Sequence, residues 1–211
     1  MLDCKNIKGM LKAVSDVMIV NKNKLIEMDS IFGDGDLGLT MSDGFEAAYS
    51  AISGSEETDL GKLLYFAGKA MASKVPSTMG TLMATGLMSS GKALKGQVEL
   101  DIKGLSLLLD SYITGVMKLG KAKRGEKTFV DGFIPAVDSM KESANSGLEL
   151  KEAIKKASDA SKEGYLQTKD MLAVHGRAAI RGEQSRMEYD PGAYVATLIV
   201  GAIADYINNV D

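Results

Sequence analysis

Residues 4–27 read CKNIKGMLKAVSDVMIVNKNKLIE, and this stretch sets the expected fold class. Its apolar side chains recur every three, four or seven positions, which places them on one face of a long helix: Ile7, Met10, Leu11, Val14, Val17, Met18 and Leu25. The same spacing recurs in residues 60–71 and 105–116. Alternating stretches rich in valine, isoleucine and threonine are nearly absent. The pattern therefore predicts an all-α protein.

We expect eight helices in a single domain spanning residues 1–211, because no linker, repeat or low-complexity tract divides the chain. Two helix starts show an N-cap residue with an acid three positions later, namely Thr40 with Asp43 and Thr128 with Asp131. The apolar run 193–204 is too short to cross a bilayer and predicts a buried core helix. The expected helices lie roughly at residues 4–27, 40–52, 59–74, 79–95, 103–119, 129–146, 150–172 and 191–209.

Composition and charge exclude several classes of partner. The 211 residues are 45% hydrophobic and 25% charged, as in an ordinary globular domain. The net charge of −3 offers no basic excess, so we expect neither nucleic acid nor a membrane as a partner. The single cysteine, Cys4, excludes an internal disulfide, and no signal pattern is evident near the start. We therefore expect a cytoplasmic protein.

The glycine-rich and charged segments fall between the expected helices. If successive helices run antiparallel, alternate loops lie at the same end of the bundle. Segments 29–38, 76–80, 120–127 and 176–190 would then meet at one rim. Helix N-termini at that rim would add partial positive charge and free N–H groups, which suit phosphate.

Three aspartates, Asp29, Asp34 and Asp36, stand close together beside the glycines of segment 33–38. Carboxylates crowded in one loop repel one another, and a hard divalent cation offsets that repulsion. The glycines let the backbone bend so that the carboxylates converge. An ordinary acidic surface turn is the alternative interpretation. The phosphate-suited rim favours a metal site that contacts phosphate through the metal.

Other loop motifs fail in this segment. Residues 33–38 match G-x-G-x-x-G, but a helix rather than a strand precedes them, and their carboxylates would repel a pyrophosphate. No Walker loop occurs in the chain. A calcium EF-hand opening at Asp34 needs glycine at its sixth position and glutamate at its twelfth, where Leu39 and Phe45 stand. A magnesium–nucleotide site is the interpretation that remains.

Further candidates precede the last helix. Arg177 and Arg181 lie in a glycine-containing segment, where arginine can bind phosphate through paired donors, although a solvated helix-end arginine is equally common. His175 is the only histidine and is a candidate base, but its position beside Gly176 is more typical of a helix end. The arginines are the stronger candidates.

Four motifs together resemble one known family. Segment 31–45 (IFGDGDLGLTMSDGF) resembles the metal loop of the nucleotide-binding L subunit of dihydroxyacetone kinase. The other matching motifs follow in the family's order and spacing, and they are 125–131 with Pro135, 176–178 with 182–183, and 190–193. The resemblance extends over nearly the whole chain.

The resemblance implies an eight-helix antiparallel barrel with a nucleotide, ADP or ATP, bound at one end. Asp29, Asp34 and Asp36 would hold two Mg²⁺ against its diphosphate, and Arg177 would reach the transferred phosphoryl group. The other implied nucleotide contacts are the phosphate-facing Leu37, Gly38, Leu39, Thr40, Thr78, Met79 and Gly80, the adenine- and ribose-facing Gly120 and Phe129, and Asp190, Pro191 and Gly192, which close the site.

The implied activity is that of a kinase subunit acting on a small ketone, dihydroxyacetone or a related ketose, held by a separate K-type subunit. Leu37 stands where the phosphotransfer-system type of the family typically has a histidine, and Tyr189 stands where a histidine is expected just before Asp190. Pro76–Gly80 replaces the Gly-Gly-Ala-Ser-Gly loop, and the Gly-Asp-Gly-Asp form of residues 33–36 is closer to ATP-dependent relatives. Two donors stay open: a phosphotransfer-system protein that recharges bound ADP, or exchange of ATP. These departures also fit a non-catalytic nucleotide-sensing regulator, and a carrier of apolar ligands inside the barrel is a weaker third interpretation.

Overall fold

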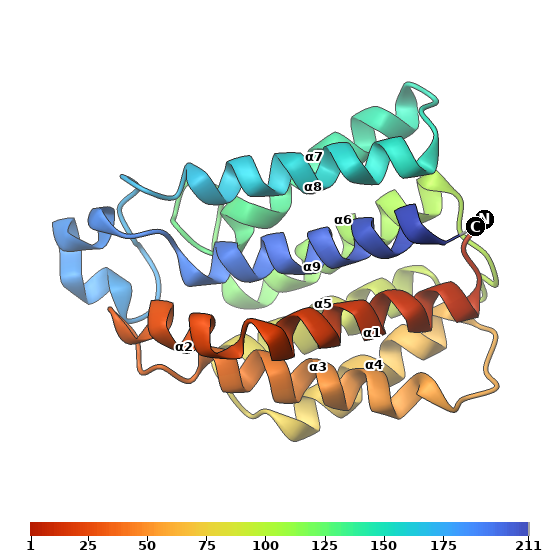
Figure 1. The fold of residues 1–211 in the computed structure, drawn as a ribbon, viewed down its shortest axis with the longest axis horizontal. Helices are drawn as coiled ribbons and strands as arrows, with labels where there is room; N and C mark the ends of the chain where they lie inside the picture. The colour runs from red at the N-terminus through yellow and green to blue at the C-terminus, as the bar shows by residue number, and fades with distance from the viewer. Residues whose placement is uncertain (211) are drawn as a thin grey trace.

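Long helices laid side by side make up the chain in our computed structural model, which describes residues 1–210 (Figure 1). No strand occurs among these residues, so the all-α prediction is confirmed. In chain order the elements are α1 (Cys4–Val20), α2 (Lys22–Ser30), α3 (Leu37–Ser53), α4 (Leu60–Lys74), α5 (Thr78–Ala93), α6 (Ile102–Gly120), α7 (Phe129–Asn145), α8 (Leu150–Leu166), the 3₁₀ helix η1 (Ala178–Met187) and α9 (Pro191–Asn209).

The helices close into an antiparallel barrel. α3 packs on α1, each helix from α4 to α7 packs on the one before it, and α9 packs on both α7 and α1. α8 lies against α7 and α9. In Figure 1 the N-termini of α3, α5, α7 and α9 lie together at the left, at the end of the molecule opposite both chain termini. The expected common rim is therefore present.

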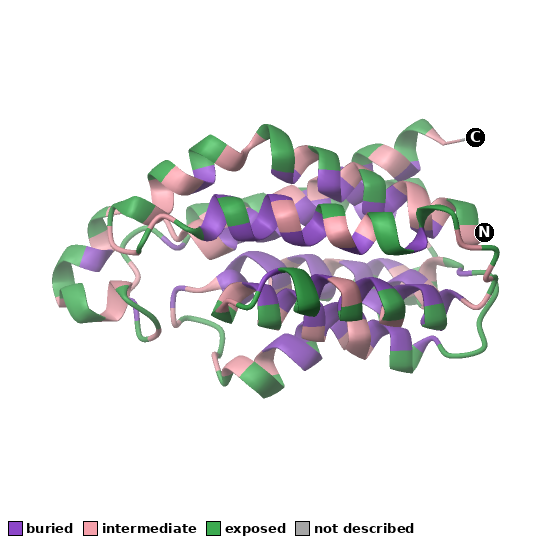
Figure 2. Cartoon of the chain, turned by 90° about the horizontal axis from the view of Figure 1, so that it is seen from below, coloured by how far each residue is buried: buried purple, intermediate pink, exposed green. Residues whose placement is uncertain are grey.

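Apolar side chains fill the space between the helices, and Figure 2 shows their buried positions on the inward faces. The helical spacing in residues 4–27 is confirmed: the positions that define it are buried except for the half-buried Val17, whereas Ile19 and Val20, outside the pattern, are exposed. The run 193–204 is a buried part of α9, as expected. Within residues 1–210, no helix is both long and apolar enough to cross a membrane.

Three predicted helix boundaries were wrong. The expected helix 4–27 divides into α1 and α2 at Asn21, whose side-chain amide donates to the Val17 carbonyl at 2.9 Å and whose side-chain oxygen accepts from Tyr194 Oη at 3.1 Å. The expected helix 40–52 begins earlier, at Leu37, so Thr40 is not its N-cap. By contrast, Thr128 and Asp131 form the predicted capping box of α7.

The third error concerns α8, which ends at Leu166 and not at residue 172. Thr168 Oγ1 donates to the Tyr165 carbonyl at 2.7 Å, and Asp170 has a positive φ of 70° that a helix does not accommodate. Residues 167–190 therefore form a long connection that contains η1. We call residues 167–190 the Arg177 segment.

The close approach of α4 and α5 depends on two glycines. A Cβ atom on Gly61 would lie 2.4 Å from the Gly91 carbonyl oxygen, and a Cβ on Gly91 would lie 2.6 Å from the Gly61 carbonyl oxygen. Each glycine thus makes room for the backbone of the other helix. Any larger side chain here must push the two helices apart.

Candidate nucleotide and metal site

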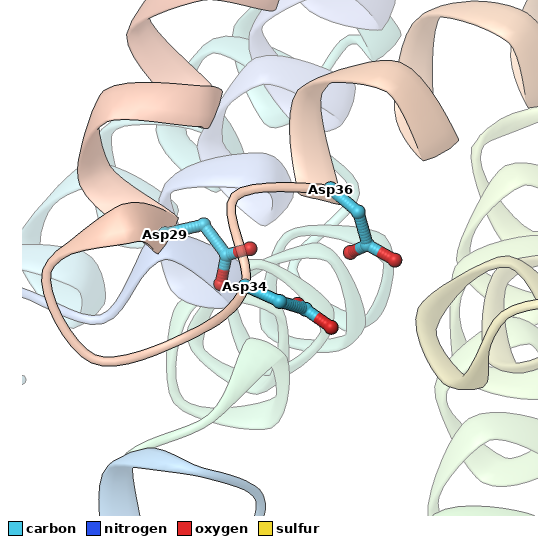
Figure 3. Close-up of side chains that lie close together, drawn as sticks. All are labelled: Asp29, Asp34 and Asp36. Carbon is cyan, nitrogen blue, oxygen red and sulfur yellow. The ribbon is translucent and has the colours of Figure 1, made fainter.

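The three aspartates converge at the rim from two helices and the loop between them (Figure 3). Asp29 lies in the last turn of α2, Asp34 in the loop, and Asp36 at the N-cap position of α3. One oxygen from each carboxylate lies within 4.8 Å of the others. Gly35 has a φ of 73°, and a Cβ on Gly33 would lie 2.2 Å from Asp29 Oδ1. The tight loop thus requires glycine at both positions.

The electrostatics of the cluster suit a cation. Displacement of water from around its carboxyl raises the pKa of Asp36, and the negative charges of Asp34 and Asp29 raise it further. Arg177 supplies one positive charge, with its Nη2 atom 2.6 Å from Asp34 Oδ2. A set of converging carboxylate oxygens with a residual negative charge matches the donors that Mg²⁺ prefers. The residues present therefore fit the implied metal.

Two helix N-termini flank the aspartates. Ser77 caps α5 by accepting the Gly80 N–H at 3.0 Å, and Thr40 Oγ1 in the first turn of α3 donates to Ser77 Oγ at 3.3 Å. This contact brings residues 37–40 close to the N-terminus of α5, which begins at Thr78. Of the other first-turn N–H groups, those of Gly38, Leu39, Thr78 and Met79 lack intrahelical acceptors and can donate to an anion. Sequence reasoning missed Ser77, although a serine directly before a helix is a typical N-cap.

At Leu37 and Gly38, the backbone and not a side chain faces the rim. The Leu37 side chain is buried in the core, and its N–H lies 3.4 Å from Asp29 Oδ2. A Cβ on Gly38 would lie 2.1 Å from the Lys22 carbonyl oxygen, so this glycine lets α3 approach α2. Neither residue brings a titratable group to the site.

The N-termini of α7 and α9 meet on another part of the rim. A Cβ on Gly192 would lie 3.1 Å from the Phe129 nitrogen, while the Phe129 ring turns into the core and stacks on Phe133 with centroids 5.1 Å apart. Asp190 caps α9 by accepting the Ala193 N–H at 2.6 Å. Burial raises the pKa of Asp190 to about 7, against the opposing effects of the Ala193 N–H and the Lys127 charge.

The Arg177 segment contacts loop 121–128 through residues that sequence reasoning did not assign. Glu126 Oε2 lies 2.6 Å from His175 Nε2, so His175 forms a side-chain pair and does not lie at a helix end. The buried Lys127 ammonium donates to the Thr168 and Glu188 carbonyls at 2.7 and 2.6 Å. The stretch Gly125–Thr128 before α7 was the only sequence feature that pointed to these residues, and nothing in its composition indicates a buried lysine.

Comparison with known proteins specifies the family of this all-helical barrel, whose rim carries clustered carboxylates and converging helix N-termini. The family model of the DAK2 domain matches residues 31–205. The chain belongs to the DAK2 domain family.

Relatives and solved structures agree with this assignment. The chain is 32% identical to the ADP-binding subunit DhaL of PEP-dependent dihydroxyacetone kinase 1 from Listeria innocua, over 87% of this chain and 86% of that protein. It is 29% identical to the corresponding Escherichia coli subunit, over 89% of each chain. The crystal structure of C. freundii dihydroxyacetone kinase in complex with AMP-PNP and Mg²⁺ matches the fold with a TM-score of 0.71 at 21% identity. That match covers 94% of this chain but about a third, 33%, of the kinase chain.

Proposed function

We propose that this chain is the nucleotide-binding subunit of a dihydroxyacetone-type kinase. It passes a phosphoryl group from a Mg²⁺-bound nucleotide to a small ketone held by a separate K-type subunit. Support comes from the DhaL relatives, which the chain matches over most of their length and which are described as ADP-binding subunits. Relatives that act on erythrulose favour small ketoses as the substrate class.

One observation carries the proposal: three carboxylate oxygens within 4.8 Å of one another lie beside the N-termini of helices at one rim. Phosphoryl transfer needs positioning and charge neutralisation more than a protein nucleophile. Bound Mg²⁺ would neutralise phosphate charge between Asp29, Asp34 and Asp36, and two ions suit three carboxylates shared with a diphosphate. Arg177, beside Asp34, supplies a positive charge for the phosphoryl group being transferred.

The rim geometry supports the remaining contacts of this proposal. The backbones of residues 37–40 and 78–80 bind phosphate oxygens from opposite sides, since the Thr40–Ser77 contact holds these turns together. Residues 190–192 close the site beside Phe129. Because the Phe129 ring is buried, its backbone is the part that borders the base and ribose, with Gly120 at the end of α6.

The nucleotide that co-purifies with the chain tests the proposal and separates the two donors. Mass spectrometry of the denatured, freshly purified protein should detect an adenine nucleotide in near-stoichiometric amount. Retained ADP supports recharging by a phosphotransfer-system protein, whereas readily exchanged ATP supports direct use of ATP. Absence of any nucleotide, together with no binding of added Mg·ADP or Mg·ATP, would contradict the proposal.

A nucleotide-sensing regulator of the same fold is the second candidate, and the buried Leu37 side chain favours it. The phosphotransfer-system type of the family typically has a histidine at that position, whereas here position 37 brings no titratable side chain to the rim. Turnover of dihydroxyacetone in the presence of a K-type subunit distinguishes the two functions. Nucleotide binding without turnover, with either donor supplied, would favour the regulator.

A further inference from the structure

One buried lysine, Lys127, contacts the Arg177 segment near both of its ends. The Lys127 ammonium donates to the carbonyls of Thr168 and Glu188, which lie near the two ends of the segment. The Lys127 side chain is almost fully buried, and its backbone has a positive φ of 59°. A buried ammonium is costly unless its N–H groups are bonded. These two bonds therefore hold both ends of the segment against loop 121–128.

The neighbouring residue, Glu126, holds the middle of the segment. Its Oε2 atom lies 2.6 Å from His175 Nε2 and accepts the Lys123 N–H at 2.7 Å. Its carbonyl accepts the Val174 N–H at 3.3 Å. The hydrogen bond from His175 lowers the pKa of Glu126, with the Lys123 N–H contributing next. Arg177 follows His175 after a single glycine, so the position of His175 restricts that of Arg177.

The segment also has contacts within itself: the Ala173 N–H donates to Ser185 Oγ at 3.0 Å, and the Asp170 N–H donates to the Arg186 carbonyl at 3.0 Å. Three apolar side chains on the segment, Val174, Ile180 and Met187, are 52%, 85% and 70% exposed and contribute little packing. The Arg177–Asp34 pair is itself exposed, and exposed ion pairs stabilise a structure only slightly. A segment with few buried contacts is held mainly by its specific polar contacts.

We propose that Glu126 and His175 are positioning residues that hold Arg177 at the phosphates of the bound nucleotide. The inference rests on the proposed function, in which Arg177 reaches the transferred phosphoryl group. Glu126 and His175 touch no nucleotide themselves. They act through the backbone between His175 and Arg177, while Lys127 holds the two ends of the segment in place.

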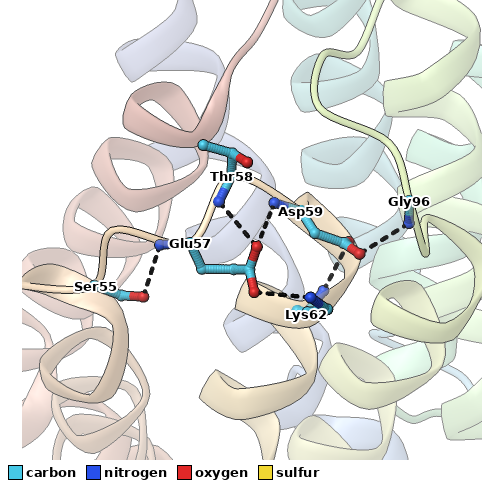
Figure 4. Close-up of polar contacts among 6 residues, drawn as sticks. All are labelled: Ser55, Glu57, Thr58, Asp59, Lys62 and Gly96. Atoms are coloured by element: carbon cyan, nitrogen blue, oxygen red, sulfur yellow. Dashed lines mark hydrogen bonds and ion pairs between the residues drawn. The ribbon is translucent and has the colours of Figure 1, made fainter.

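Glu57 provides a matched control at the opposite end of the barrel (Figure 4). Its side chain is 26% exposed, as is that of Glu126. It likewise accepts loop backbone N–H groups, from Thr58 and Asp59, and pairs with a cation, Lys62, at 3.0 Å. Glu57→Ala therefore measures the general cost of losing such a carboxylate, far from Arg177.

The experiment compares the affinities of the full chain for Mg·AMP-PNP and Mg·ADP, because Arg177 should favour the nucleotide that carries the additional phosphoryl group. Glu126→Ala should lower the ratio of these affinities about fivefold, as expected for a displaced charge-assisted contact. His175→Ala, at a more exposed position, should lower it similarly. Glu126→Gln, which keeps a hydrogen-bond acceptor, should restore part of the ratio, and Glu57→Ala should leave it unchanged.

Two further readouts separate positioning from a general structural effect. In an Arg177→Ala background, Glu126→Ala should cause no additional loss, since it acts through Arg177. Hydrogen exchange across residues 170–187 should be faster in Glu126→Ala than in Glu57→Ala. An unchanged affinity ratio, additive losses, or an equal effect of Glu57→Ala would overturn the positioning role. If the wild-type chain binds neither nucleotide, the proposed function itself fails.

Discussion

At the residue scale, the rim joins acidic groups with different tasks. Asp29, Asp34 and Asp36 crowd together and suit a cation, whereas Asp190 caps a helix beside the buried Lys127. Carboxylates of one chemical type thus differ by their surroundings. Displacement of water raises the pKa of Asp36 and the charges of Asp34 and Asp29 raise it further, whereas burial raises the pKa of Asp190 against the Ala193 N–H and the Lys127 charge.

Asp190 makes stability depend on pH in a defined direction. Its pKa of about 7 lies above the ordinary value of 3.8, so the folded state holds this proton more tightly than the unfolded chain does. The resulting stabilisation is fully present below pH 3.8 and is lost as pH rises through about 7. Asp190→Asn, which keeps an N-cap side chain, should remove this dependence.

Urea unfolding of both proteins at several pH values checks this prediction. The wild-type free energy of unfolding, minus that of Asp190→Asn, should fall by at most about 1.4 kcal/mol per pH unit across this range and level off above it. Parallel curves for the two proteins would show that Asp190 ionises at an ordinary pKa.

At the element scale, helix starts connect stability to the candidate site. Ser77 caps α5 and also contacts Thr40 on α3, so one hydroxyl joins two phosphate-facing turns. Asp101 caps α6 by accepting the Gly104 N–H at 2.8 Å, but it lies at the other end of the barrel. The two caps allow the cost of a lost cap to be separated from an effect on the site.

Ser77→Ala and Asp101→Ala should each lower the free energy of unfolding by about 1 kcal/mol, the usual cost of a lost N-cap. Only Ser77→Ala should also weaken Mg·ADP binding, because only Ser77 aligns the turns at the rim. Denaturant unfolding and calorimetric titration measure the two effects. Equal Mg·ADP affinity in both variants would show that nucleotide binding does not depend on the Thr40–Ser77 contact.

The elements also show what sequence patterns could predict. Apolar spacing located the long helices, and antiparallel alternation correctly brought their loops to one rim, because both follow from local periodicity and short connections. The division at Asn21 and the early end of α8 depend on tertiary hydrogen bonds, from Tyr194 in the first case and around Thr168 in the second. The roles of Glu126 and Lys127 likewise depend on partners about 40 to 60 residues away.

At the scale of the whole molecule, close packing of the barrel helices sets the distances between the rim segments. Close contacts such as that between Gly61 and Gly91 leave no room for adjustment. Gly54 offers a contrast, since a Cβ there would have no atom within 4 Å and its φ of −91° suits any residue.

Gly91→Ala should therefore lower the free energy of unfolding by about 1–3 kcal/mol, the usual cost of overpacking, by separating α4 from α5. Gly54→Ala should change it by less than about 0.5 kcal/mol. Thermal and denaturant unfolding of both variants measure the difference. Similar stabilities would mean that the α4–α5 contact adjusts freely.

The central claim is that the aspartate cluster binds nucleotide through Mg²⁺, and calorimetric titration of ADP with and without Mg²⁺ tests it most directly. Asp36→Asn is the sharpest variant because it removes one carboxylate charge and leaves the Arg177–Asp34 pair in place. The wild-type chain should bind ADP tightly only with Mg²⁺, and the variant should lose at least about tenfold in affinity with Mg²⁺ present. Equal ADP affinity for both proteins, with or without Mg²⁺, would contradict the account.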